Sequence, residues 1–212
     1  MGLTRNSKTF KTKKTENITK ENKNIIVLLG NPNVGKTTLF NSLTGLRQHT
    51  GNWPGKTVSN AEGKIKIKNK TYNLIDLPGI YSLNAYSEEE QIAKNFIKNK
   101  DIDIILVVVD ATSLERNLNL VLETKNIKNN IIVCLNLLDE AKKKNINIDI
   151  KKLEKKLNLP VIGMSAREKL GINKLIEKIE IDENKNIYVF WGFSNQDITE
   201  KYDGSPVNFE NL

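Results

Sequence analysis

GNPNVGKTT, at residues 30–38, is the stretch that decides the fold. It matches the pattern G-x-x-x-x-G-K-[ST] through Gly30, Gly35, Lys36 and Thr37. The apolar run NIIVLLG comes directly before it and ends at a glycine, as a buried strand does. The segment KTTLFNSLTG follows with helical spacing of its apolar residues. A strand, this loop and a helix in that order predict a phosphate-binding loop.

Phosphate binding needs these residue types. Gly30 and Gly35 let the backbone approach a diphosphate closely, so that successive N–H groups and the helix N-terminus face the anion. Lys36 places a positive charge on the β- and γ-phosphates, and the Thr37 hydroxyl ligates Mg²⁺. We therefore expect the whole loop to contact a nucleotide: Gly30, Asn31, Pro32, Asn33, Val34, Gly35, Lys36, Thr37 and Thr38.

Beyond the loop, strand-like and helix-like segments alternate along the chain. Residues 64–77 predict a β-hairpin with its turn at Asn69–Lys70. Further strands are expected at 103–110, 131–136 and 160–165, and further helices at 87–99, 114–127, 148–158 and 169–179. Strands separated by helices predict a mainly parallel sheet covered on both faces. We expect a three-layer α/β/α P-loop NTPase fold with a six-stranded sheet and one antiparallel strand at its edge.

Composition and charge exclude several classes of protein. The chain has 212 residues, of which 38% are hydrophobic and 27% charged, as in soluble globular proteins. Its longest apolar run, 104–109, is far short of the roughly 20 residues that span a bilayer. Residues 1–24 hold seven Lys and Arg against two Glu, so most of the net charge of +8 lies there. We interpret residues 1–23 as a basic disordered tail, and nucleic-acid binding is not expected.

Three further motifs follow predicted strands, and together they indicate the reaction and the base of the nucleotide. Asp76 and Gly79 form D-x-x-G, where the carboxylate holds Mg²⁺ through a water and the Gly79 N–H meets the γ-phosphate. Asn136 and Asp139 form N-x-x-D, whose carboxylate can accept the two donors that guanine offers and adenine lacks. Ser165–Ala166 offers a backbone N–H to the oxygen of the base. Ligands of open α/β sheets bind at these strand ends. The intervening residues Leu77, Pro78, Leu137 and Leu138 belong to the same expected site.

Taken in order, these motifs resemble the five motifs of the small GTPase fold over about residues 24–180, which implies a Ras-like sheet. Two positions depart from that pattern. Ile80 stands where many GTPases carry a water-orienting Gln, and Leu137 stands where a Lys usually stacks on the base. With TGNWPGKTV at 50–58 and DLPGIYSL at 76–83, the chain is similar to the amino-terminal G domain of the ferrous iron transport protein B family.

The resemblance implies that RQHTGNWPGKTV, at residues 47–58, is switch I. It carries little apolar periodicity, and we expect a loop that the nucleotide orders. Thr57 would ligate Mg²⁺ only when a γ-phosphate is present, with Gly55 and Lys56 beside the nucleotide, so hydrolysis would release the loop. Trp53 has three open interpretations: a lid over the nucleotide, a partner-docking residue or a packing residue. His49 is interpreted as a surface residue.

The resemblance also implies how hydrolysis proceeds without a water-orienting Gln. Arg47 is only a weak candidate for an arginine finger, and K⁺ held by Asn33 and the switch I backbone would stabilise the transition-state charge instead. The expected catalytic residues are therefore Lys36, Thr57, Gly79 and Asn33. The expected metal ligands are Thr37, Thr57 and Asp76 for Mg²⁺ and Asn33 for K⁺.

The function that follows is Mg²⁺-dependent, K⁺-stimulated hydrolysis of GTP to GDP that regulates Fe²⁺ uptake. The resemblance implies a cytoplasmic location at the inner face of the cell membrane and a membrane permease domain as partner. Residues 181–212 form an extension that the pattern leaves open between an added strand and a frayed tail. A truncated transporter, a shortened expression product and a free-standing regulator all stay open, as does the oligomeric state. Two alternative functions are a ribosome-assembly or RNA-modifying GTPase and a GTP-sensing protein without turnover.

Overall fold

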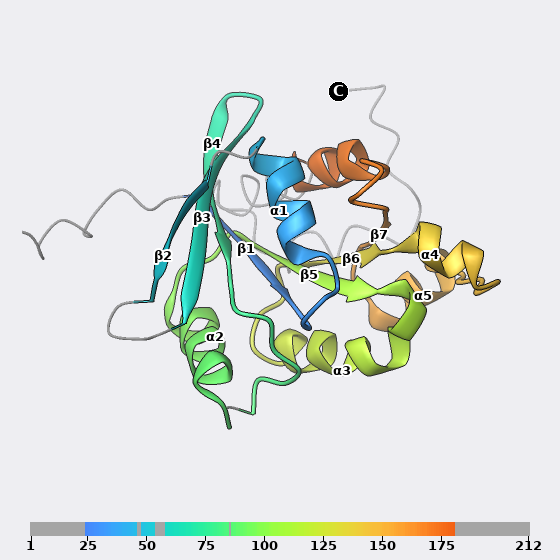
Figure 1. Cartoon of the computed structure of the whole chain (residues 1–212), viewed down its shortest axis with the longest axis horizontal. Coiled ribbons are helices and arrows are strands. Elements are labelled where there is room, and N and C mark those ends of the chain that lie inside the picture. The colour runs from blue at the N-terminus through green and yellow to red at the C-terminus, as the bar shows by residue number, and fades with distance from the viewer. Residues whose placement is uncertain (1–23, 46–47, 54–57, 85, 181–212) are drawn as a thin grey trace, which may run out of the picture.

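A single mixed sheet forms the centre of the computed structural model, which describes residues 24–180 except 46–47, 54–57 and 85. Its seven strands lie in the order β2-β3-β4-β1-β5-β6-β7 (Figure 1). Their bounds are β1 Ile25–Gly30, β2 Gln48–Asn52, β3 Ser59–Ile67, β4 Lys70–Asp76, β5 Ile104–Asp110, β6 Ile131–Asn136 and β7 Val161–Gly163.

The parallel part of the sheet runs from β4 through β1, β5 and β6 to β7. Every residue of β1 and β6 is buried, as is nearly all of β5, which explains why these strands are continuous apolar runs. All five strands end at the same edge. The motifs that follow β1, β4, β6 and β7 therefore gather there.

Helices cover both faces of this sheet. Their bounds are α1 Lys36–Thr44, α2 Glu88–Asn99, α3 Leu114–Lys125, α4 Leu138–Lys143 and α5 Ile150–Leu157, with a 3₁₀ turn η1 at Ala111–Ser113 and a last helix at residues 172–180. Ser87 and Glu90 close a capping box at the start of α2, as S-x-x-E before a helix predicts. No helix in the described part of the chain is long and apolar enough to cross a bilayer.

Two apolar clusters separate the layers. One packs α1 and the helix at 172–180 on one face of the sheet, through residues such as Phe40 and Leu175. The other packs α2, α3 and α5 on the opposite face, through residues such as Ile97, Val121 and Leu157 (Figure 1). The predicted three-layer α/β/α fold of the P-loop NTPases, with a mainly parallel sheet, is confirmed.

The sequence prediction differs from the structure at three places. The sheet has seven strands rather than six, because β2 lies in the segment expected to be a loop and pairs antiparallel with β3. Backbone pairing along an open sheet edge needs no apolar side chains, so periodicity could not reveal it. The hairpin turn is at Lys68–Asn69, one residue earlier than predicted, with Lys68 at φ 50°. Helix α4 was not predicted.

Candidate nucleotide-binding site

The phosphate loop joins β1 to α1 and requires glycine at two positions. A Cβ at Gly30 would lie 2.5 Å from the carbonyl oxygen of Val108 on β5. Gly35 has φ 88°, and a Cβ there would overlap Nδ2 of Asn136. Both glycines therefore let the loop pack directly on neighbouring strand ends, and the φ of Gly35 lies in a region that other residues rarely adopt.

The N-terminus of α1 opens onto this loop and has no capping side chain among the described residues. Its N-cap, Gly35, has no side chain to accept a hydrogen bond, and the first turn contains no acidic residue. The first backbone N–H groups of a helix lack partners within the helix, so an anion is their natural ligand. Thr37 and Thr38 are exposed at this end of the helix.

Lys36 and Asp76 meet at the centre of the site. The Lys36 Nζ lies 3.0 Å from Oδ1 of Asp76, and the two side chains are only 11% and 12% exposed. Burial raises the pKa of the Asp76 carboxyl, and the Lys36 charge opposes that rise. The pair brings together at one point the cation predicted to bind phosphate and the carboxylate predicted to bind a metal ion.

The donor set suits magnesium. Asp76 provides a carboxylate and Thr37 an exposed hydroxyl, and hard oxygen donors of this kind bind Mg²⁺ together with nucleotide phosphates and water. The third predicted ligand, Thr57, lies outside the described residues, as do Gly55, Lys56 and Arg47. Asn33, the predicted K⁺ ligand, is exposed at φ 64° and makes no side-chain hydrogen bond to any described residue.

The segment after β4 lies on the phosphate loop. The Ile80 N–H donates to the Gly30 carbonyl at 3.2 Å, and Gly79 packs so closely that a Cβ there would be 3.2 Å from Cα of Pro32. Leu77 and Ile80 are buried in the apolar core, and Pro78 is half-buried. The burial of Ile80 gives a physical reason for the absence of a polar, water-orienting side chain at this position.

Asn136 links three motifs. Its buried side chain donates from Nδ2 to the Val34 carbonyl at 2.9 Å and accepts the Ala166 N–H on Oδ1 at 2.9 Å. The Ser165 N–H donates to the Leu170 carbonyl at 3.2 Å. The backbone N–H groups of Ser165 and Ala166, one of which is predicted to reach the oxygen of the base, therefore both have protein partners here. The sequence did not indicate this bridging role, which depends on contacts across 102 and 30 residues.

A cavity of about 620 Å³ lies between α4 and residues 163–170. Two of its lining residues, Asp139 and Ser165, have a buried side-chain oxygen without a hydrogen-bond partner among the described residues. Leu137 begins α4 in the left-handed conformation, at φ 62°. The full lining is Leu138, Asp139, Lys142, Lys143, Gly163, Met164, Ser165, Glu168 and Leu170. An apolar cavity with a few unpaired polar atoms suits a planar heterocycle.

The structure supports the packing role among the three interpretations of Trp53. Its ring packs edge-on against Phe96 of α2, with 5.4 Å between ring centroids and 70° between planes. The backbone N–H of Trp53 donates to the Val58 carbonyl at 2.9 Å. Trp53 is thus a packing residue that joins the end of β2 to α2. His49 lies in β2, but its side chain is outside the described part of the structure.

A glycine-rich loop between β1 and α1, a Lys36–Asp76 pair and an Asn136 bridge at one edge of a parallel sheet define the G-domain class of P-loop NTPases. The model of one family, described as ferrous iron transport protein B, matches residues 24–179. The chain belongs to this family.

Known relatives and solved structures agree with this assignment. The chain is 47% identical over 164 residues to the Fe(2+) transporter FeoB of Escherichia coli K12, with 76% of this chain and 21% of the relative covered. Identity to the Fe(2+) transporter FeoB of Campylobacter jejuni is 42% over 156 residues, with 74% and 25% covered. The matched region therefore spans about a quarter or less of these relatives.

Among solved structures, the G domain of the T. maritima FeoB iron transporter has a TM-score of 0.71 and 42% identity, with 76% of this chain and 98% of that chain covered. The cytosolic domain of the same transporter in a GDP form has a TM-score of 0.71 and 43% identity, with 74% and 62% covered. The FeoB G domain of Methanococcus jannaschii has a TM-score of 0.67 and 43% identity, with 75% and 96% covered.

Proposed function

We propose that residues 24–180 bind guanine nucleotides with Mg²⁺ and hydrolyse GTP, stimulated by K⁺, in a protein that regulates Fe²⁺ uptake. The observation that carries this proposal is the Asn136 bridge, which fixes the phosphate loop and the predicted base-binding motif against each other. A GDP form of the T. maritima relative supports the choice of nucleotide.

The chain's own groups supply most of the chemistry. The open N-terminus of α1 and the Lys36 ammonium stabilise negative charge on the phosphates, in a site where both Lys36 and Asp76 are largely shielded from water. Asp76 and Thr37 would hold Mg²⁺, which neutralises phosphate charge when bound. Asn33 would hold K⁺, which adds positive charge where the transition state needs it. Because Ile80 is buried, orienting the water falls to the backbone at residues 79–80.

Selectivity for guanine tests the assignment of Asp139. Replacing Asp139 with Asn removes an acceptor for two donors of the base, and a hydrogen bond to a charged group contributes roughly 1.5–3 kcal/mol. We expect GTP affinity to fall by about 100-fold while ATP affinity stays the same, as measured by displacement of a fluorescent GDP. Asp101→Asn, at an exposed carboxylate away from the site, is the matched control. Unchanged preference for GTP over ATP would refute the base assignment.

Potassium dependence tests the role of Asn33. Phosphate release by the wild-type protein should be about tenfold or more faster in KCl than in NaCl, because removal of one charge-stabilising group costs at least that much. Asn33→Ala should lose this stimulation and keep its affinity for GDP. Asn145→Ala is the control, since Asn145 is also exposed with a positive φ, 56°, but lies outside the phosphate loop. Equal wild-type rates in the two salts would rule out a K⁺ site.

The link to iron uptake comes from the names of the relatives, of which this chain matches only part. We propose that the G domain acts at the inner face of the membrane on a Fe²⁺ permease domain or partner. Fe²⁺ uptake by cells that produce the permease with the Lys36→Ala variant should fall to the level without any G domain. Family membership favours this function over a ribosome-assembly or RNA-modifying GTPase. A GTP sensor without turnover predicts saturable binding but no K⁺-stimulated phosphate release.

A further inference from the structure

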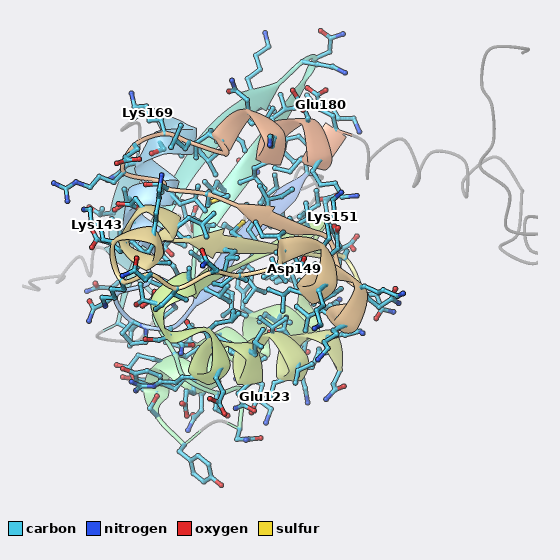
Figure 2. All side chains as sticks on the ribbon, turned by 90° about the vertical axis from the view of Figure 1, so that its right-hand side faces the viewer. Glu123, Lys143, Asp149, Lys151, Lys169 and Glu180 are labelled. Carbon is cyan, nitrogen blue, oxygen red and sulfur yellow. The ribbon has the colours of Figure 1, made fainter. Side chains whose placement is uncertain are left out.

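One carboxylate on α3 gathers the polar groups of the segment that follows Gly79. Glu123 accepts the Ser82 hydroxyl at 3.0 Å on each of its two oxygens, and it accepts the Leu83 N–H at 2.5 Å. The amides of Asn84 and Asn119 donate to the same carboxylate at 3.3 and 3.1 Å. Figure 2 shows Glu123 on α3, at the lower side of the molecule. No nucleotide-binding motif contains this residue.

Glu123 belongs to a stripe along one side of α3. Arg116, Asn119 and Glu123 are spaced i, i+3 and i+7, which places them on one face of a helix. The Arg116 guanidinium lies 4.5 Å from the centroid of the Tyr81 ring. We call these three residues the α3 stripe. It contacts residues 81–84 through a cation–π pair and a set of hydrogen bonds.

The same segment is fixed at its other end by the phosphate loop. Ile80 donates its N–H to the Gly30 carbonyl at 3.2 Å, and Gly79 packs against Pro32. The side chains of Ile80 and Leu83 are 2% and 3% exposed, so both are held in the core. Residues 79–84 are thus held between the phosphate loop and the α3 stripe, with Glu123 as the main polar anchor on the side of α3.

The buried Ile80 side chain leaves the orientation of the attacking water to the backbone at residues 79–80. Because no side chain at position 80 can orient water, the Gly79 N–H and the neighbouring backbone must act from fixed positions. Preorganised donors accelerate a reaction only while their geometry is held, and a displacement of 1 Å can cost roughly 100-fold in rate. The Ser82 hydroxyl and the Leu83 N–H would lose their acceptor if the Glu123 carboxylate were removed.

We propose that Glu123 is a positioning residue for GTP hydrolysis, an inference that rests on the proposed GTPase activity. It holds residues 82–84 so that the backbone at residues 79–80 stays in place over the phosphate loop. It contacts neither the phosphates nor the base-binding cavity, so it affects turnover rather than nucleotide affinity.

The test compares Glu123→Ala, Glu123→Gln, Ser82→Ala and the Ser82→Ala/Glu123→Ala double variant with the wild-type protein. Phosphate release in KCl gives kcat and KM, and titration with a fluorescent GDP gives Kd. Glu123→Ala should lower kcat about tenfold or more, with KM and the Kd for GDP within about twofold of the wild-type values. Glu123→Gln keeps one acceptor oxygen, so its kcat should be within about threefold of the wild-type value. The double variant should be no slower than Glu123→Ala, because both changes remove the same contact.

Glu115→Ala is the matched control. Glu115 is exposed on the same helix and its side chain has no hydrogen bond or ion pair to any described residue, so kcat should stay at the wild-type value. A kcat for Glu123→Ala within about twofold of wild type would overturn the proposal. A parallel loss of GDP affinity, or failure of Gln to restore turnover, would show a general structural role and overturn it as well. Absence of phosphate release by the wild-type protein would instead contradict the proposed GTPase function itself.

Discussion

Gly35→Ala lowers the free energy of unfolding by roughly 3–6 kcal/mol and abolishes saturable nucleotide binding. An alanine at φ 88° costs about 1–2 kcal/mol, and its Cβ would overlap Nδ2 of Asn136. Asn136 must then move away from Val34 and Ala166, and each buried group left without a partner costs about 1–3 kcal/mol. Urea unfolding and titration with fluorescent GDP measure the two effects.

Gly45→Ala separates the local strain from the contact with Asn136. Gly45 ends α1 at φ 62°, but nothing lies within 4 Å of the Cβ that alanine would add. This variant should lose only about 1–2 kcal/mol and keep wild-type affinity for GDP. Equal losses of stability in the two variants would mean that the Asn136 bridge does not hold the phosphate loop.

Lys36→Ala should weaken nucleotide binding by roughly 30-fold to several-thousand-fold. Truncating one partner of a buried charged pair typically costs about 2–5 kcal/mol, and Lys36 is the cation predicted to meet the phosphates. Titration of the variant with fluorescent GTP and GDP checks this directly. Lys68→Ala is the control: the Lys68 side chain is 70% exposed and pairs with Glu180. This change should leave the affinity for GTP and GDP at the wild-type value. Wild-type affinity in Lys36→Ala would remove Lys36 from the site.

The stability of the Lys36→Ala variant should also depend more strongly on pH than that of the wild-type protein. Burial already raises the pKa of Asp76, and loss of the opposing Lys36 charge raises it further. The folded state then binds a proton more tightly than the unfolded chain. Its added stability is therefore present below the unfolded pKa, about 4, and is lost as pH rises through the higher folded pKa. Urea midpoints measured from pH 4 to pH 8 should fall more steeply in the variant than in wild type.

The elements of the fold that could be predicted are those marked by patterns of neighbouring residues in the sequence. Strands β1, β5 and β6 are uninterrupted apolar runs, and Ser87 with Glu90 marks the start of α2. The spacing of Gly30, Gly35 and Lys36 defined the phosphate loop. Because parallel strands end at one edge, the motifs after them could be placed together without coordinates.

The parts that were missed depend on contacts between distant residues. Strand β2 is held by backbone pairing to β3, which leaves no trace in side-chain periodicity. Helix α4 has only six residues and starts from a left-handed Leu137, so it lacks a usual capping signal. The contact of Glu123 with Ser82 joins residues 41 apart. The roles of Gly55, Lys56 and Thr57 stay predictions, since these residues lie outside the described structure.

We propose that this edge of the sheet binds a guanine nucleotide with its phosphates on residues 30–38. The most direct measurement is titration of the purified protein with fluorescent GTP in the presence of Mg²⁺, followed by displacement with unlabelled GTP, GDP or ATP. We expect a saturable signal that GTP and GDP displace and ATP does not. A signal that never saturates, or that ATP displaces as readily as GTP, would contradict it.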